Sequence, residues 1–269
     1  MQFQAFRCFG EQAGDGNPAL VIEHDLSNID ARQAFAQERN ITCAWIDPAD
    51  EDGVVANVDY FYPHTRSPLC LHATLAVGQR LFMQHGSHRE LTVKTAAHGQ
   101  RLGLVPGAEG QVFVRLQRQQ ASQPNITPDL VGRLLAAPGL VPLAQARVFS
   151  VGSPKLLVEV ADAATLHGLT PDLSAIVAWS KIAGVNGLYV YCKVDDGSYE
   201  GRNFNHLDPV LEDSATGVAA GALTALLGHS ILLRQGRATG RACLIATGIE
   251  GTDILVGGKV EIASPARHP

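Results

Sequence analysis

The alternation of polar and apolar residues along the chain predicts a mixture of strands and helices. Residues 2–7 alternate as a half-buried strand does, and the apolar run 19–22 follows a Gly-Asp-Gly-Asn-Pro turn, which predicts a hairpin. Ser27 or Asn28 can cap a helix that extends to about Asn40. Further helices are expected at 73–84, 128–137, 171–183 and 214–227. Further strands are expected at 42–46, 54–62, 90–95, 102–105, 112–116, 148–151, 156–160, 187–191, 242–246 and 254–256.

One arrangement of residues occurs twice, about half a chain apart. An aromatic, strand-like stretch at 60–63 leads through a polar loop to a helix start at 68–76, and 202–205 leads in the same way to 211–220. A helix that begins with small residues leaves unpaired backbone N–H groups open to an anion. The repeat therefore predicts two halves that face each other across one anion-holding cleft, as in an enzyme that acts on a small carboxylate.

The number of strands relative to helices predicts an α+β fold. Few units alternate strictly as strand, helix and strand, which argues against a Rossmann fold, and the chain has no GxGxxG or P-loop motif. The polar stretch 117–125 reads as the crossing between halves. We therefore expect an N-terminal half at 1–116 and a C-terminal half at 117–269, with the C-terminal segment crossing back as the alternative.

Composition excludes several classes of protein. The chain has 269 residues, 46% of them hydrophobic, and a net charge of −5, so no basic field recruits nucleic acid or an anionic membrane. The start lacks the pattern of a signal peptide, and no apolar run is long enough to span a bilayer. Five scattered cysteines without CxxC spacing, and dispersed histidines, predict a cytoplasmic protein without disulfides or a metal site.

Five motifs occur in the order in which a known family carries them. They are Gly-Asn-Pro-Ala at 16–19, Asn-Ile-Thr-Cys-Ala at 40–44, Pro-Leu-Cys-Leu-His-Ala-Thr-Leu-Ala at 68–76, Glu-Asp-Ser-Ala-Thr-Gly at 212–217, and Gln-Gly at 235–236 with Val-Gly-Gly at 256–258. The chain resembles the phenazine-biosynthesis isomerase-like (PhzF-like) family, relatives of diaminopimelate epimerase. The resemblance implies two pseudo-symmetric halves, each a curved sheet wrapped around a central helix. It also implies a homodimer, an active site between the halves, and cofactor-free proton transfer next to a carboxylate.

The chain departs from the family pattern at four positions. Cys43 stands where the family has its acid/base glutamate, and Leu71 replaces a glycine. Val218 replaces a serine, and Arg66 replaces an acidic residue. A glycine tolerates a close approach of backbone to ligand that leucine resists, so Leu71 is expected to narrow the first anion site. Arg66 is either a second charge for a diacid or a solvated arginine.

The resemblance assigns catalysis to Cys43, His72 and Asp213. Cys43 would be the proton-transfer group, since a thiol serves as base or acid when neighbours lower its pKa. The structural alternative is a buried cysteine that acts as a small hydrophobic residue. Cys70 would be a wall of the pocket or a second proton carrier. This assignment predicts that Cys43→Ser abolishes turnover and that Cys70→Ser does much less.

The expected substrate-binding residues surround the two helix starts. Backbone amides after Asp213 would hold the substrate carboxylate. We consider three hypotheses: an isomerase or epimerase of a small amino or hydroxy acid, a catalytically inactive binding or regulatory protein, and covalent chemistry at Cys43. The candidate binding residues are Asn17, Cys70, Leu71, Ser214, Ala215, Thr216, Gly217 and Val218.

Overall fold

The structure is a computed structural model that describes residues 1–86, 89–205 and 212–263. It divides into two compact units. The first contains Met1–Arg115 and the described chain from Gly257 onward, and the second contains Leu116–Val256. Strand β15 (Asp253–Ala263) carries the chain from the second unit back to the first. The fold is α+β, and each unit is a curved sheet around a central helix.

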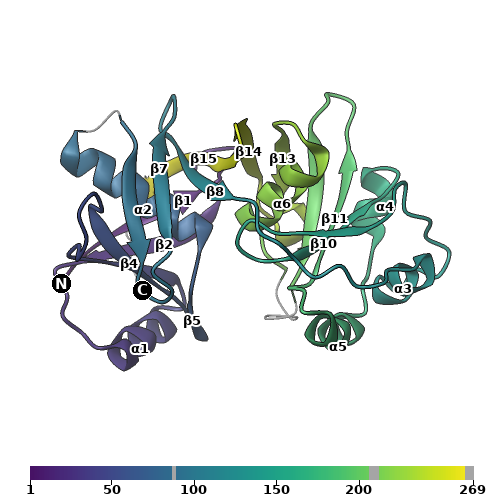
Figure 1. Ribbon diagram of the computed structural model, residues 1–269, viewed down its shortest axis with the longest axis horizontal. Coiled ribbons are helices and arrows are strands. Elements are labelled where there is room, and N and C mark those ends of the chain that lie inside the picture. The colour runs from purple at the N-terminus through teal and green to yellow at the C-terminus, as the bar shows by residue number, and fades with distance from the viewer. Residues whose placement is uncertain (87–88, 206–211, 264–269) are drawn as a thin grey trace. The chain divides into compact units, whose positions relative to one another are not determined.

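The first unit is a closed sheet around helix α2 (Leu71–His85). Its strands follow the order β1-β2-β3-β4-β6-β7-β8-β15, and β15 also pairs with β1. Helix α2 packs against β1, β2, β3 and β7, whereas α1 (Ile29–Arg39) contacts β4 on the opposite face (Figure 1). The strands are β1 (Gln2–Cys8), β2 (Asn17–Glu23), β3 (Thr42–Asp47), β4 (Ala56–Tyr62), β5 (Thr65–Ser67), β6 (Leu91–Thr95), β7 (Arg101–Pro106) and β8 (Gln111–Gln117).

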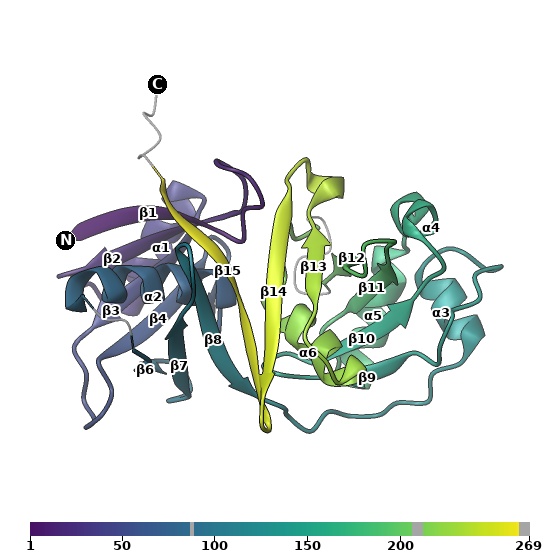
Figure 2. The same cartoon turned by 90° about the horizontal axis from the view of Figure 1, so that it is seen from above.

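The second unit is built around helix α6 (Gly217–Leu227), which packs against β14, β9 and β10 (Figure 2). Its sheet has the order β14-β13-β12-β11-β10-β9. The other face of this sheet forms an apolar core with the remaining helices of the unit. The elements are α3 (Pro128–Leu134), β9 (Arg147–Phe149), β10 (Lys155–Glu159), α4 (Ala163–Gly168), α5 (Leu173–Ala183), β11 (Leu188–Lys193), β12 (Tyr199–Phe204), β13 (Leu232–Gln235), the 3-10 turn η1 (Arg237–Thr239) and β14 (Cys243–Glu250).

The two units repeat the same sequence of connections, which confirms the predicted pseudo-symmetry. In the first unit, parallel β2 and β3 are joined through α1, and parallel β4 and β6 through α2. In the second unit, parallel β10 and β11 are joined through α4 and α5, and parallel β12 and β13 through α6. The central helix therefore follows the equivalent antiparallel strand pair in both units.

Side-chain alternation gives the first sheet two distinct faces. The Tyr60 hydroxyl bonds the Thr74 hydroxyl of α2 at 2.7 Å. The next residue, Phe61, packs instead with Ala36 of α1. Because successive side chains of a strand point to opposite faces, cross-strand partners of Tyr60 face α2 and partners of Phe61 face α1.

Several elements differ from the sequence expectation. Strands β5 and β13 and helix α4 were not expected, and β12 begins before the predicted aromatic stretch. Strand β15 runs over eleven residues, whereas only 254–256 were predicted. Helix α6 begins at Gly217 with Thr216 as its N-cap, three residues after the expected start.

Candidate functional site

The start of α2 brings a thiol and an imidazole together. Cys70 is the N-cap of the helix, in an extended conformation, and His72 is the second helical residue. The Cys70 Sγ lies 3.4 Å from Nδ1 of His72 and 3.7 Å from Nε2. The Thr74 hydroxyl donates to the Cys70 carbonyl at 2.8 Å, which secures the first turn. The motif at 68–76 thus fixes both groups on one rigid turn.

The surroundings of Cys70 favour its thiolate. Burial opposes ionisation, but the charge and hydrogen bond of His72 outweigh it, and the pKa of Cys70 is lowered. The Tyr62 hydroxyl and the nearby backbone N–H of Ala73 also favour the thiolate and lower the pKa of Cys70. The positive end of the α2 dipole acts in the same direction. Cys70 is therefore a buried thiol whose surroundings lower its pKa and favour the thiolate, the form that accepts a proton.

Two further residues lie on the α2 face of the sheet near this thiol. Cys8 pairs with Asn17 across β1 and β2, and both are buried. Burial raises the pKa of Cys8, and the charge of Cys70 raises it further, so Cys8 remains a neutral thiol. The Tyr62 and His72 rings lie 6.5 Å apart. Asn17, Cys70 and His72 therefore lie on the α2 side of the first sheet, and their role as a site stays a prediction.

Cys43 does not share that face. It pairs with Phe61 across β3 and β4 and lies in the apolar cluster that packs against α1, on the side opposite to α2. Its side chain is fully buried, and its thiol donates a hydrogen bond to the Ile41 carbonyl at 3.5 Å. Burial raises the pKa of Cys43 to about 12. This environment fits the structural alternative of a buried cysteine that acts as a small hydrophobic residue, and the catalytic role of Cys43 stays a prediction.

The loop before α6 is held by one glutamine. Gln235 donates through Nε2 to the Asp213 carbonyl at 2.6 Å and to the Thr216 hydroxyl at 3.0 Å. Its Oε1 accepts from the Thr216 N–H at 3.2 Å and from the Tyr189 hydroxyl at 2.9 Å. The Thr216 hydroxyl also donates to the Asp213 carboxylate at 2.7 Å. Gln235 thus uses its donors and its acceptor to fix Asp213 at the start of α6.

The neighbouring turn supports the same loop. The Ser214 and Thr239 hydroxyls lie 2.6 Å apart. Gly236 has a φ of +104°, and a Cβ there would lie 2.9 Å from the Ser214 carbonyl oxygen. Only glycine fits this backbone, which explains the Gln-Gly pair in physical terms. Ser214 therefore acts in the loop's framework in this structure.

The two central helices lack side-chain caps. Neither Cys70 before α2 nor Thr216 before α6 makes a capping hydrogen bond through its side chain. Every other α-helix among the described residues is capped by a side chain that accepts from a first-turn N–H. The backbone N–H groups of Gly217 and Val218 donate no hydrogen bond to any described residue. These amides suit an anionic ligand. The capping residues of the other helices are Asn28, Thr127, Asp162 and Asp172.

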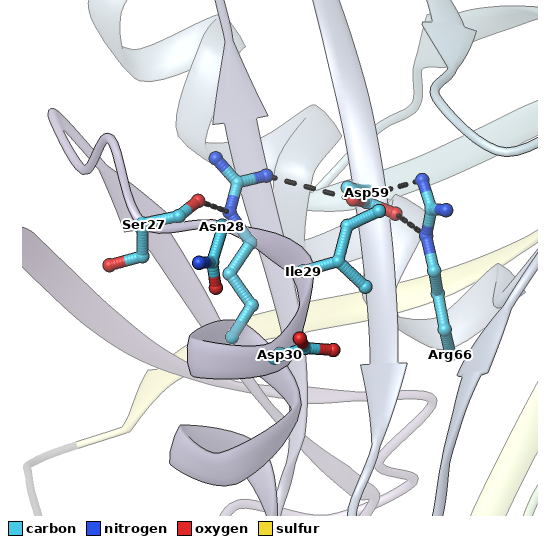
Figure 3. Close-up of a pocket in the computed structure, with 7 residues that line it drawn as sticks. Ser27, Asn28, Ile29, Asp30, Asp59 and Arg66 are labelled. Atoms are coloured by element: carbon cyan, nitrogen blue, oxygen red, sulfur yellow. Dashed lines mark hydrogen bonds and ion pairs between the residues drawn. The ribbon is translucent and has the colours of Figure 1, made fainter.

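Arg66 belongs to an ion-pair network on the α1 side of the first unit. It donates to the Asp59 carboxylate from Nε at 2.8 Å (Figure 3). Arg32 binds Asp47 through two hydrogen bonds of 2.7 Å. Arg32, Asp59, Arg66 and the start of α1 line an open hollow of about 610 Å³. The positive and negative charges largely neutralise one another. Arg66 is thus a paired arginine, and this hollow lies on the sheet face opposite to Cys70.

The described residues contain neither a metal-type cluster of side chains nor a membrane-spanning helix. No cluster of three or more histidine, cysteine, aspartate or glutamate side chains there has the arrangement of a metal site. None of the helices in the described ranges is both long and apolar enough to cross a membrane.

The sequence matches one family model over nearly its full length. Residues 6–263 match the family described as phenazine biosynthesis-like protein. The chain belongs to this family. The resemblance drawn from the five motifs is thereby confirmed.

Relatives and solved structures give the family assignment its context. An "Uncharacterized isomerase" from Deinococcus radiodurans is 33% identical over 251 residues, which cover 84% of this chain and 77% of the relative. A predicted epimerase from Pseudomonas aeruginosa superposes with a TM-score of 0.79 at 22% identity, over 97% of this chain and 96% of that one. A hydroxyproline epimerase from Agrobacterium vitis, solved with bound trans-4-hydroxy-L-proline, superposes with a TM-score of 0.57 at 13% identity, over 98% and 91% of the two chains. The solved structures share the fold of this chain. The chain itself, as a member of the family, is an isomerase.

The departures from the family pattern leave both helix starts intact. Leu71 is the first residue of α2, is 4% exposed, and has no positive φ. It therefore replaces the family glycine without backbone strain. Val218 lies in the first turn of α6, where its side chain replaces a hydroxyl but its N–H remains. Ala215, three residues before Val218, is buried.

Sequence reasoning missed two buried polar residues in the second unit. Lys155 opens β10 and is 1% exposed, and Asn203 of β12 is also 1% exposed. The ammonium of Lys155 has no hydrogen bond or ion pair with a described residue, and neither amide atom of Asn203 has a partner among them. Burial lowers the pKa of Lys155 to about 7, although the Asp213 carboxylate acts in the opposite direction. A lysine at the start of the apolar run 156–158 was the available signal.

Proposed function

We propose that the protein is a cofactor-independent isomerase or epimerase that moves a proton next to the carboxylate of a small amino or hydroxy acid. Cys70 is the proton carrier in this proposal. The observation that carries it is the contact of 3.4 Å between the Cys70 thiol and His72 at the start of α2. The lowered pKa of Cys70 and the raised pKa of Cys43 support the choice between the two cysteines.

In the proposed proton transfer, one C–H bond breaks as one S–H bond forms. The Cys70 thiolate takes the proton from the carbon next to the carboxylate, so that an S–H bond forms and the C–H electron pair moves toward the carboxylate. A positively charged His72 stabilises the thiolate before the transfer. Return of the Cys70 proton to another carbon shifts the double bond. Epimerisation instead takes a proton from water at the opposite face of the same carbon, and the Cys70 thiol then releases its own proton to water. Backbone amides stabilise the negative charge that develops.

The second helix start supports the carboxylate in the proposal. The N–H groups of Gly217 and Val218, which donate to no described residue, are suited to a carboxylate. Asp213 is kept beside them by Gln235 and Thr216. We assign Asp213 a catalytic role, as the family resemblance implies, and place Ala215 and Ser214 in the supporting loop.

Deuterium exchange tests the assignment of the proton carrier. Small amino and hydroxy acids, trans-4-hydroxy-L-proline among them, are incubated with the protein in deuterated water and examined by mass spectrometry. The active protein should introduce deuterium at the carbon next to the carboxylate. Cys70→Ser should lower this exchange at least about 100-fold, because a serine hydroxyl is far too weak an acid to replace the thiol. Cys43→Ala, the matched control, should retain the exchange, and the reverse result would overturn the assignment.

A ligand-binding protein on the same scaffold is the second candidate. The observation that favours it is Cys43, which stands in place of the family glutamate and is buried in an apolar cluster. Ligands would then raise the melting temperature without any exchange into carbon. Cys70→Ser would leave that stabilisation unchanged.

The proposal also includes a cytoplasmic homodimer, as the family resemblance implies. Light scattering coupled to size-exclusion chromatography measures the mass directly. A mass near twice 28.6 kDa at micromolar concentration supports the dimer, and a mass near 28.6 kDa contradicts it.

A further inference from the structure

The sheet face of the second unit that packs against α6 carries two buried polar side chains, Lys155 and Asn203. Neither makes a side-chain hydrogen bond with a described residue. Lys155, Leu157 and Tyr189 lie on this face, because Leu156 and Val190 point to the apolar core on the other side. Asn203 pairs directly with Tyr189 across β11 and β12 and therefore shares the face. The face is the one that α6 covers. The two side chains thus belong to one layer around α6.

The start of α6 belongs to the same layer. The Tyr189 hydroxyl reaches Gln235, which binds the Asp213 carbonyl and Thr216. Lys155 lies within electrostatic range of the Asp213 carboxylate. A buried ammonium, a buried amide and an uncapped helix N-terminus therefore converge on one region of the unit. The Lys155 ammonium, the Asn203 amide and the first backbone N–H groups of α6 are all hydrogen-bond donors, and none of them has an acceptor among the described residues.

Buried polar groups without partners are rare in folded proteins, because each costs free energy. Lysine is almost never fully buried unless it is paired. An anionic ligand would remove this cost: a carboxylate accepts from an ammonium, an amide N–H and backbone N–H groups at the same time. The combination therefore indicates a ligand rather than a structural role.

We propose that Lys155 and Asn203 form a carboxylate-binding site with the start of α6, in which Lys155 binds the ligand as an ammonium ion. The proposal rests on the proposed function for the class of ligand, a small carboxylate. It adds the residues that recognise the ligand and a proton that is taken up on binding. The amine is partly neutral in the empty site and gains a proton from water when the carboxylate arrives; no covalent bond forms.

The charged groups around Lys155 set the pH dependence. Asp213 precedes α6, and the helix itself carries no titratable side chain. Tyr189 faces the site from β11, and Arg147 lies on the neighbouring strand β9. Since the empty-site pKa of Lys155 is about 7 and the bound carboxylate raises it, binding is strongest below pH 7. The affinity should fall about tenfold per pH unit above pH 7, until the pKa of the complex is reached.

Lysine-selective NMR tests the proposal directly. The chain has five lysines (Lys94, Lys155, Lys181, Lys193 and Lys259), so the side-chain Cε signals of ¹³C-labelled lysine are few and can be assigned by substitution. Propionate is the probe, and propanamide is its uncharged control. The Lys155 signal should titrate near pH 7 in the empty protein, and propionate should move that midpoint upward by at least about one unit. Propanamide should not move it.

Matched variants separate recognition from folding. Lys155→Met keeps the length of the side chain and removes its charge, and should weaken propionate binding at pH 6 at least about tenfold. Asn203→Leu should weaken it less. Lys193→Met removes an exposed lysine from β11 and should change nothing. Propionate that binds equally well to the wild-type and Lys155→Met proteins, or that leaves the Lys155 signal unmoved, overturns the proposal.

The same experiments distinguish this proposal from the proposed function. Carboxylate binding through Lys155 without deuterium exchange in any substrate would sink the isomerase mechanism and leave the binding site standing. Deuterium exchange with an unchanged KM in Lys155→Met would sink the binding site and leave the mechanism at Cys70 standing.

Discussion

Replacing Lys155 with methionine should stabilise the empty protein. The pKa of this lysine falls from an ordinary value of 10.5 to about 7 because its side chain is buried. Each unit of such a difference corresponds to about 1.4 kcal/mol between the folded and unfolded states. The protonated lysine therefore opposes folding by roughly 5 kcal/mol, and by about 4 kcal/mol at pH 7, where part of the population is already neutral. Methionine carries no charge and packs well in an apolar site.

The stabilisation expected from Lys155→Met depends on pH, because the pKa of Lys155 differs between the folded and unfolded states. Below pH 7 the folded and unfolded states both hold the proton on Lys155, so the full penalty is present. Between pH 7 and 10.5 the unfolded chain holds a proton that the folded chain has lost, and the free energy of unfolding rises by up to about 1.4 kcal/mol per pH unit. The advantage of Lys155→Met over the wild-type protein should therefore be largest near pH 6 and shrink steadily toward pH 10.

The two tryptophans allow the measurement to be made unit by unit. Trp45 lies in the apolar cluster of the first unit, and Trp179 packs against the core of the second. Urea unfolding in Trp45→Phe and Trp179→Phe backgrounds then reports on one unit at a time. Lys155→Met should shift the transition seen through Trp179 to higher urea and leave the one seen through Trp45 in place.

Two outcomes would refute the reasoning. A Lys155→Met protein that is less stable than the wild type at pH 7 would show that the lysine makes stabilising contacts. An advantage that does not change between pH 6 and 10 would show that the amine is not the titrating group. Lys193→Met, an exposed substitution, should change the free energy of unfolding by no more than about 0.5 kcal/mol.

Three further predictions concern residues around the two helix starts. Gly236→Ala should destabilise the second unit by about 2 kcal/mol or more in urea unfolding, because the new Cβ meets two carbonyl oxygens at a positive φ. Arg202→Met should cost about 3–5 kcal/mol in the same assay, because it leaves Glu212 and two carbonyl groups without their donor. Cys70 should react with iodoacetamide with a pH midpoint below that of a free thiol, and His72→Gln should raise that midpoint; an unchanged midpoint would contradict the pairing.

Much of the fold could be read from the sequence because its elements carry strong local signals. Helix α1 begins at Asn28, whose side chain accepts from the Ala31 N–H, as its capping position predicts. The elements that were missed are short or conceal their signal. Helix α4 has six residues and β13 has four, which is too little for a clear periodicity. Strand β15 continues through Gly257 and Gly258, residues that in a sequence read as the end of a strand.

The candidate site was only partly predictable, for a reason that Cys43 makes plain. A motif gives the position of a residue along a strand, but the face that its side chain occupies depends on strand pairing. Cys43 pairs with Phe61, and that register places it against α1. A shift of one residue in the pairing would place it on the α2 face instead. The relative position of Cys70 and His72 does not depend on strand pairing, because both lie in one helical turn that the local sequence determines.

The two central helices, α2 and α6, both begin without a side-chain cap that would stabilise their first turn. The other α-helices among the described residues satisfy a first-turn N–H with a capping side chain, an arrangement worth about 1 kcal/mol each. The central helices α2 and α6 forgo it. Beside α2, a histidine lowers the pKa of a buried thiol, and beside α6, burial lowers the pKa of a lysine. Both groups therefore have a pKa below the ordinary value, and that of Lys155 is about 7. Local instability at these two places, within otherwise well-packed units, is what a site for proton transfer and anion binding requires.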